Sequence, residues 1–238
     1  MHMMRNDHRY TETEAKVLDL TLILHAEHGG GNNSAFTTHV VSSSGTDTYS
    51  AISAAIGSLK GPRHGGANAK VMGMIKDIKE HISSLTNEKE IKDYLEKIIR
   101  KQAYDRTGLV YGLGHAVYTV SDPRAVILEK AADTLAKEKG REDEMELYRI
   151  IKSVAPKLFA EITGHDKILS PNVDFFSGFV YNMLGLPEDV FTPMFAMARV
   201  PGWCAHRIEE MTVSSRIIRP AYKSLSSRAP YVRLEDRQ

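Results

Sequence analysis

Hydrophobic positions along this chain recur at the spacing of α-helices, in segments separated by glycine, proline and small polar residues. The first segment runs through Val17, Leu18 and Leu24, and Thr11 stands three residues before Glu14, as in a helix capping box. Apolar residues at a spacing of three and four positions indicate amphipathic helices. Further helices are expected over residues 34–44, 48–60, 66–82, 87–101, 122–139, 141–162, 172–185 and 193–211.

Glycine and proline set the expected ends of these helices. Three consecutive glycines at 29–31 stop the first one, and Gly140 closes the helix that Asp122 caps. Pro156 is expected to bend or interrupt the helix over 141–162. The alanine- and serine-rich segment 48–60 is interpreted as a deeply packed helix. The tail from 212 to 238 carries six basic and two acidic residues and is expected to form an extended arm with at most short strands.

No alternating series of polar and apolar residues predicts a sheet, so the expected fold class is all-α.

The composition of the chain excludes several classes of protein but does not indicate a function. The chain has 238 residues with a net charge of +1, which gives no global field for nucleic acid or an anionic membrane. A single cysteine excludes an intrachain disulfide and a multi-cysteine zinc site. No apolar run is long enough to span a membrane, and the first residues lack a signal-peptide core, so a cytoplasmic protein is expected.

The stretch from Gly108 to Ala125 is the first candidate for chemistry. Its glycines at 108, 112 and 114 lead to His115 and allow the backbone to approach a ligand closely. Arg124 follows the capping residue Asp122, at a helix N-terminus where anions are favoured. Histidine and arginine together suit a carboxylate or keto acid, although a surface loop before a capped helix explains the same residues.

Four other residues stand in settings that point to chemistry. His64 lies among glycines before a helix, where the helix dipole favours a neutral imidazole that can donate to a developing enolate oxygen. Asp174 precedes two phenylalanines, which would desolvate it and make it a better base. Arg199 and Arg219 lie in apolar runs and need anionic partners. A small substrate with several carboxylates and an acid–base reaction at a carbonyl would use the whole set.

A metal site is the alternative chemistry that the histidines suggest. His25 and His28 stand three apart at a helix end, and His39 follows, so the three could ligate a metal ion in a helical hydrolase. The remaining histidines, His206 among them, are interpreted as ordinary surface or boundary residues.

Five motifs together resemble the citrate synthase family, in order and at that family's spacing. They are LHAEHGGGNNSAFTTH, GSLKGPRHGGAN, GLGHAVYTVSDPRA, PNVDFFSGFVY and FAMARVPGWCAH. The resemblance implies an all-helical homodimer that condenses acetyl-CoA with oxaloacetate, or propionyl-CoA in the 2-methylcitrate synthases of the family. It implies coenzyme A as co-substrate, no metal and no permanently bound cofactor.

The resemblance also implies a role for each matching residue. Asp174 would take the methyl proton of acetyl-CoA, His64 would hold the thioester oxygen, and His115 would polarise the oxaloacetate carbonyl. Oxaloacetate would be held by His28, Arg124 and Arg199, and by Arg219 from the partner subunit. The residues implied against coenzyme A are Leu109, Val110, Tyr111, Gly112, Leu113 and Gly114.

Two departures from the family pattern qualify these roles. The chain resembles the C-terminal part of a citrate synthase, and position 119, where many members carry Arg or Lys, holds Thr119. The implied domains are a large domain over 1–64 and 185–238 and a small domain over 65–184. A non-catalytic helical subunit that binds a partner is the alternative to an enzyme.

Overall fold

The computed structural model describes residues 1–114, 121–164, 169–213 and 216–237, and this part of the chain is helical, with no strand. Its α-helices are α1 (Glu12–His25), α2 (Asn33–Ser42), α3 (Thr48–Lys60), α4 (Ala67–His81), α5 (Glu88–Ile99), α6 (Pro123–Lys139), α7 (Glu142–Thr163), α8 (Val173–Met183) and α9 (Phe191–Val213). Two short 3₁₀ helices, η1 (Glu188–Val190) and η2 (Leu234–Asp236), complete the described elements. The all-α prediction is confirmed.

Polar caps fix the helix starts where the sequence predicts them. Thr11 and Glu14 form the reciprocal capping box of α1. The side chains of Asp47, Asp122 and Asn172 accept backbone N–H groups at the starts of α3, α6 and α8. Gly140 ends α6 with φ of 63°, the left-handed conformation that glycine adopts most easily.

Two prolines behave differently from the sequence prediction. Helix α7 continues through Pro156, so of the bend or interruption expected there, the interruption does not occur. The neighbouring Val154, Ala155 and Leu158 are buried, and their packing holds the helix across the missing hydrogen bond. Helix α9 begins two residues before Pro193, which lies in its first turn, where backbone N–H groups have no helical acceptor.

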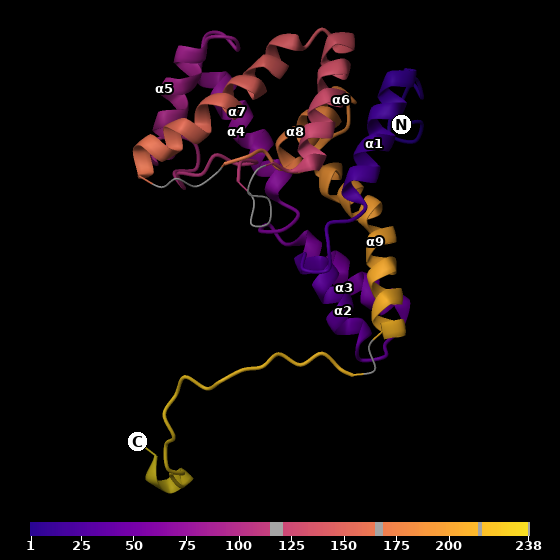
Figure 1. Cartoon of the computed structure of the whole chain (residues 1–238), viewed down its shortest axis with the longest axis vertical. Coiled ribbons are helices and arrows are strands. Elements are labelled where there is room, and N and C mark those ends of the chain that lie inside the picture. Colours follow the sequence, from indigo (N-terminus) through magenta and orange to yellow (C-terminus); the bar gives the residue numbers. More distant parts are fainter. Residues whose placement is uncertain (115–120, 165–168, 214–215, 238) are drawn as a thin grey trace.

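The buried apolar residues form two clusters of unequal size. The larger is built mainly from α1 and α4–α8, and the smaller contains Ala35, Ala55, Leu59 and Trp203 from α2, α3 and α9. Figure 1 shows α9 running from the larger group of helices down to α2 and α3. The division of the chain into residues 1–64, 65–184 and 185–238 stays a prediction.

Helix α3 is buried on one face. Ala51, Ala55 and Leu59 are fully buried, whereas Tyr49 is 87% and Ile56 44% exposed. The expectation of a deeply packed helix therefore holds for the face that meets α2 and α9. The opposite face leaves apolar side chains uncovered in this chain.

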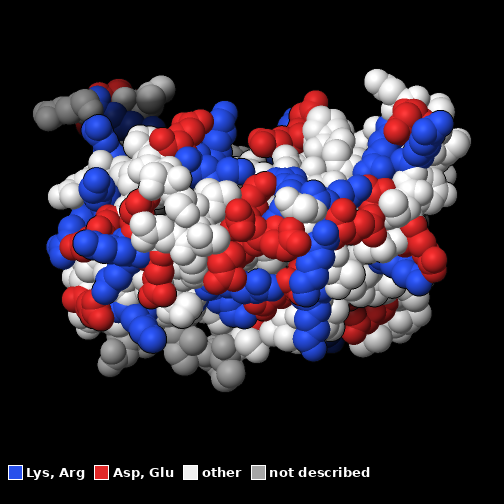
Figure 2. Space-filling view, turned by 90° about the horizontal axis from the view of Figure 1, so that it is seen from above, with Lys and Arg blue, Asp and Glu red and all other residues white. Residues whose placement is uncertain are grey.

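The described tail, residues 216–237, extends away from the helices (Figure 1) and contains only the η2 turn. The short strands allowed for in the tail do not form in these residues. Within the described ranges, no helix combines the length and the apolar character required to cross a membrane. Figure 2 shows basic and acidic side chains interspersed over the visible face.

Candidate active site

A pocket of about 230 Å³ lies where the two groups of helices meet. It collects residues from the end of α1, the loop before α4, and helices α4, α6, α8 and α9. Five of the predicted site residues line it: His28, His64, Arg124, Asp174 and Arg199. Residues more than 170 positions apart in the sequence thus share one cavity, as the proposed chemistry requires.

Among the side chains of the pocket, Arg199 has the most hydrogen-bonding atoms without a partner in the described part of the chain. It is 1% exposed, its Nε donates to the carbonyl of His25 at 2.5 Å, and its guanidinium lies 4.7 Å from the ring centre of Phe195. Both of its Nη atoms are buried without a hydrogen-bond partner in the described part of the chain. Burial, together with the charge of Arg124, lowers the pKa of Arg199 to about 10. A buried guanidinium with unused donors is a site for an anion.

Close packing of α9 against the end of α1 positions this arginine. A Cβ on Gly202 would lie 2.1 Å from the carbonyl oxygen of Ala26, so only glycine permits the observed approach. The contact brings α9 beside the segment that carries His25 and His28.

Arg124 is held by the residue that caps its own helix. Its Nε and Nη2 donate to the two oxygens of Asp122 at 3.0 and 2.8 Å, and Asp122 is completely buried. The bidentate pair orients the guanidinium at the wall of the pocket. The capping role predicted for Asp122 is confirmed, and its pairing with Arg124 adds a contact that the sequence did not predict.

Asp174 lies in the first turn of α8, partly exposed to the pocket. Burial raises the pKa of its carboxyl to about 6, against the opposing effect of the Arg124 charge. A carboxylate with this pKa accepts a proton more readily near neutral pH than an ordinary aspartate. The desolvation expected at this position from the sequence is confirmed, although neither of the phenylalanines that follow Asp174 lines the pocket.

His64 reaches across to α2, where its Nε2 lies 3.0 Å from the hydroxyl oxygen of Ser34. The indole N–H of Trp203 donates to the same oxygen at 3.1 Å, and Ser34 is fully buried. Desolvation and the charge of Arg199 lower the pKa of His64, which keeps the ring neutral near pH 7. Neutral His64, predicted from the helix dipole, thus arises from burial and a neighbouring arginine.

Backbone hydrogen bonds join the segment Leu109–Gly114 to the residues just before α8. The amide of Asn172 donates to the carbonyl of Gly112 at 2.9 Å, and the amide of Gly114 donates to the carbonyl of Ser170 at 2.8 Å. Gly112 has φ of 79°, and a Cβ there would lie 2.8 Å from the ring of Phe175. Glycine is therefore required at 112 by both conformation and contact. None of these six residues lines the pocket, so their role toward coenzyme A stays a prediction.

The remaining predicted residues fall elsewhere. His115 lies outside the described residues. Arg219 is exposed in the tail and does not line the pocket of its own chain.

The metal set His25, His28 and His39 is wrong, because the structure does not bring these three together. His25 is buried and donates from Nδ1 to the carbonyl of Thr21, whereas His39 contacts Glu210 and His206.

Three pocket residues were missed by the sequence reasoning as ligands for substrate. His25 Nε2, Asn68 Oδ1 and the Tyr181 hydroxyl are buried without partners among the described residues. Tyr181 follows Asp174 by seven positions, which places both on one face of α8, and this spacing could have identified it. Burial lowers the pKa of His25 to about 3, so its Nε2 is an acceptor.

Comparison with known proteins agrees with this arrangement. The family model "Citrate synthase, C-terminal domain" matches residues 1–221. The chain belongs to the citrate synthase family. It is 42% identical over 217 residues to the citrate synthase of Haloferax volcanii, covering 91% of this chain and 52% of that protein. It is 40% identical over 207 residues to the 2-methylcitrate synthase of Shewanella oneidensis, covering 87% of this chain and 49% of that protein.

Solved members of the citrate synthase family share the fold. A ternary complex of the Thermoplasma acidophilum enzyme with carboxymethyl coenzyme A and oxaloacetate matches with a TM-score of 0.75 and 30% identity, covering 96% of this chain and 57% of that chain. Citrate synthase from Pyrobaculum aerophilum matches with a TM-score of 0.73 and 33% identity, over 96% of this chain and 53% of that one. The chain spans about half the length of the curated relatives it matches.

Proposed function

We propose that this chain carries out the citrate synthase reaction, in which acetyl-CoA condenses with oxaloacetate and the citryl-CoA formed is hydrolysed to citrate and coenzyme A. Family membership supports the reaction type, and the pocket supports the chemistry. The observation that carries the proposal is the pair of unused Nη donors on buried Arg199, in the same cavity as Asp174 and His64.

Each pocket residue has a role that its chemistry can perform. Asp174 removes a proton from the acetyl methyl group, since its raised pKa makes proton uptake easier. Neutral His64 donates a hydrogen bond to the thioester oxygen as negative charge develops there. His28, Arg124 and Arg199 bind the carboxylates of oxaloacetate, and His115 polarises its keto group.

The hydroxyl of Ser34 would set the tautomer of His64. In the structure this hydroxyl donates its one hydrogen to Asn32 Oδ1 at 2.8 Å, and its oxygen lies 3.0 Å from His64 Nε2. The donor role proposed for His64 requires the hydroxyl to turn from Asn32 to His64 Nε2, so that the ring keeps its own hydrogen on Nδ1 for the substrate. Ser34 is thus a positioning residue for the donor role of His64.

We also propose a co-substrate, a partner subunit and a cellular location for this chain. Coenzyme A would lie along Leu109–Gly114, and neither a metal nor a permanently bound cofactor would take part in the condensation. A homodimer would supply Arg219 to the partner's site, and the reaction would take place in the cytoplasm.

Thiol release from acetyl-CoA in the presence of oxaloacetate tests the function directly. We expect release that depends on both substrates, and loss of that release in Asp174→Asn. Propionyl-CoA is the comparison substrate, because relatives of both acyl specificities match at about 40% identity. Failure to bind oxaloacetate or to release thiol would leave the alternative of a non-catalytic subunit.

A further inference from the structure

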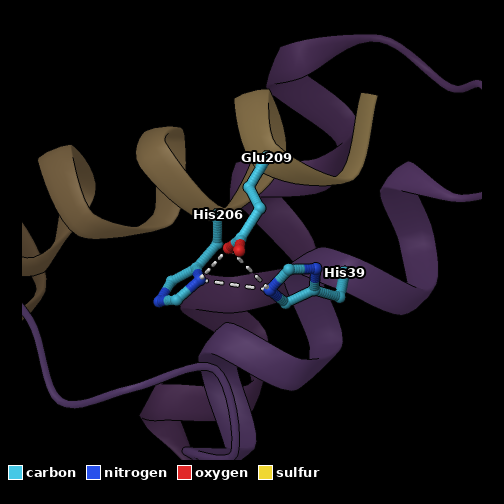
Figure 3. A group of neighbouring side chains, drawn as sticks. All are labelled: His39, His206 and Glu209. Carbon is cyan, nitrogen blue, oxygen red and sulfur yellow. Dashed lines mark hydrogen bonds and ion pairs between the residues drawn. The ribbon is translucent and has the colours of Figure 1, made fainter. Parts of the chain in front are cut away.

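A second cluster of chemically active side chains lies between α2 and α9, outside the pocket. His39 from α2 and His206 and Glu209 from α9 point toward one another (Figure 3). His39 Nε2 lies 3.1 Å from His206 Nδ1. The nearer oxygen of Glu209 lies 3.5 Å from His206 Nδ1 and 4.0 Å from His39 Nε2.

Carboxylates on the outer side of the rings determine where their hydrogens are. His39 Nδ1 lies 2.9 Å from an oxygen of Glu210, and His206 Nε2 lies 2.8 Å from an oxygen of Glu27. Ionised carboxylates only accept hydrogen bonds, so each outer ring nitrogen must carry a hydrogen. A neutral imidazole has one N–H, and the two inner nitrogens are therefore both lone-pair acceptors. Two acceptors facing each other at 3.1 Å require a positive centre between them, either a metal ion or a proton.

The spacing of the three inner atoms suits a metal ion. Zinc–nitrogen bonds of about 2.0–2.1 Å in a tetrahedron place neighbouring ligand atoms about 3.3 Å apart. The observed separations of 3.1 and 3.5 Å lie near that edge length, whereas the 4.0 Å between His39 Nε2 and the exposed Glu209 carboxylate is longer. The outer carboxylates reproduce the carboxylate–histidine–metal arrangement that orients metal-binding histidines.

Three carboxylates lie close to the ring nitrogens of this cluster. Oxygens of Glu210, Glu27 and Glu209 lie 2.9, 2.8 and 3.5 Å from the nearest ring nitrogen, and such a concentration of acidic groups favours a cation. The Oε1 atom of Glu210 is also buried without a partner in the described ranges, so part of this charge is uncompensated.

Gly30 leaves the inner nitrogens uncovered. A Cβ at Gly30 would lie 3.3 Å from His39 Nε2 and 3.7 Å from His206 Nδ1. Gly30 does not have a positive φ, so its backbone conformation does not require glycine. Absence of a side chain at this position keeps space beside the two nitrogens.

We propose that His39 Nε2, His206 Nδ1 and a carboxylate oxygen of Glu209 bind a zinc-like transition-metal ion. Glu210 and Glu27 orient the two imidazoles, and the fourth coordination position is open to water. The ion joins α2 to α9 and stabilises the smaller helical cluster. This site is separate from the condensation pocket and has no part in the reaction proposed there.

Metal titration of the untagged full chain, after treatment with a chelator, tests the proposal. Calorimetry with Zn²⁺ is expected to show one site per chain. Co²⁺ is expected to give the intense visible absorption of a tetrahedral complex with nitrogen and oxygen ligands. Zn²⁺ should also raise the melting temperature, because it binds the folded chain in preference to the unfolded one.

Four variants assign the site. His206→Gln and His39→Gln should abolish the binding, whereas Glu27→Gln should weaken it by about 10–100-fold as the loss of an orienting partner. Glu209→Gln provides the test least affected by folding, because the Glu209 side chain is 62% exposed; it too should weaken binding at least tenfold.

His81→Gln and the double variant His2→Gln/His8→Gln are the controls. His81 is an exposed histidine on α4, and the rings of His2 and His8 form another close pair, 4.6 Å apart between centres. Both controls should bind the ion as the parent does. The proposal would be overturned if the parent bound neither Zn²⁺ nor Co²⁺. It would also be overturned if Glu209→Gln and His206→Gln bound the ion as the parent does. His39 and His206 would then share a proton instead of a metal ion.

Discussion

Arg199 and Arg207 are both buried on α9, eight residues apart, but only Arg207 uses all three nitrogens within the described chain. Its Nε, Nη1 and Nη2 donate to Thr48 Oγ1, Ser42 Oγ and the Thr46 carbonyl at 3.1, 3.2 and 2.7 Å. Arg199 donates only from Nε, and both of its Nη atoms are unpartnered in these ranges. Arg207 is thus a structural residue, whereas the two Nη atoms of Arg199 can still donate hydrogen bonds to a ligand.

Arg199→Leu should therefore weaken oxaloacetate binding by about 2–5 kcal/mol, because a carboxylate loses its buried charged partner. Arg199→Lys should restore part of the affinity, since an ammonium cannot form the bidentate pair. Isothermal calorimetry measures both. Arg124→Leu is expected to weaken binding in the same direction.

Arg207→Leu is the matched control for this prediction. It should lower the melting temperature more than Arg199→Leu, because three structural hydrogen bonds are lost, and leave oxaloacetate affinity unchanged. Equal oxaloacetate affinity in the parent, Arg199→Leu and Arg124→Leu would remove both arginines from the substrate site.

Asp174→Asn should abolish exchange of the acetyl-CoA methyl protons, a loss of about 10²–10⁴ in rate or more, while leaving oxaloacetate binding nearly intact. The carboxamide keeps the shape of the side chain and loses its basicity. Exchange is followed by NMR in deuterated buffer. Exchange at the parent rate in the variant would exclude Asp174 as the base.

The same variant should be more stable than the parent at neutral pH. The folded-state pKa of Asp174, about 6, is above its ordinary value of 3.8, so the folded chain retains a proton that the unfolded chain has lost. The free energy of unfolding therefore falls as pH rises from about 4 to about 6, because the folded chain must then ionise a buried carboxyl. Above about pH 6 the destabilisation by ionised Asp174 is complete. Asn should recover up to about 3 kcal/mol at pH 7.5 and nothing near pH 3. Denaturant unfolding at both pH values checks the prediction, and a pH-independent difference would contradict it.

Glu14 should show the opposite pH dependence. Burial alone would raise its pKa, but hydrogen bonds from Arg5, Lys139 and the Thr11 amide lower it to about 2. Its stabilisation is complete above the ordinary pKa of 4.5 and is lost as pH falls toward about 2. Glu14→Gln should cost about 3 kcal/mol at pH 7. Denaturant unfolding with Glu12→Gln as the exposed control should show little change in the control, and equal effects of the two substitutions would refute the prediction.

Local signals explain how much of the fold could be predicted from the sequence. Asp47, Asp122 and Asn172 each cap a helix by a contact within three residues, so the residue and its neighbours are sufficient. Pro156 does not interrupt α7, because burial of the residues around it outweighs its local effect. Such local signals do not show which residues distant in the sequence come into contact. Nothing local to His64 shows that its ring meets Ser34, 30 positions earlier, and nothing near His39 shows that it meets His206.

The pocket residues were identified through motif resemblance and unusual settings, not through geometry. Arg199 stands out in the sequence because a charge in an apolar run needs a partner. Tyr181 and Asn68 are polar residues of ordinary type in helical segments, and only the fold shows that they are buried in the cavity wall.

Exposed apolar side chains on two helices favour self-association of this chain. Tyr49 and Ile56 on α3 and Met211 and Val213 at the end of α9 are exposed, as is Arg219 in the extended tail. Apolar area of this kind favours association of copies. We expect light scattering of the dilute protein to show a dimer or a larger assembly.

Mixing two inactive variants tests whether Arg219 serves a second copy. Arg219→Leu and Asp174→Asn chains should each release little thiol alone. In a mixed two-fold dimer, one site combines the intact Asp174 of one chain with the intact Arg219 of the other. Random exchange of equal amounts places half of the chains in mixed dimers, so about a quarter of parental activity should return. A monomer in light scattering, or no recovery after the subunits have exchanged, would contradict the shared site, because Arg219 would then act within its own chain or not at all.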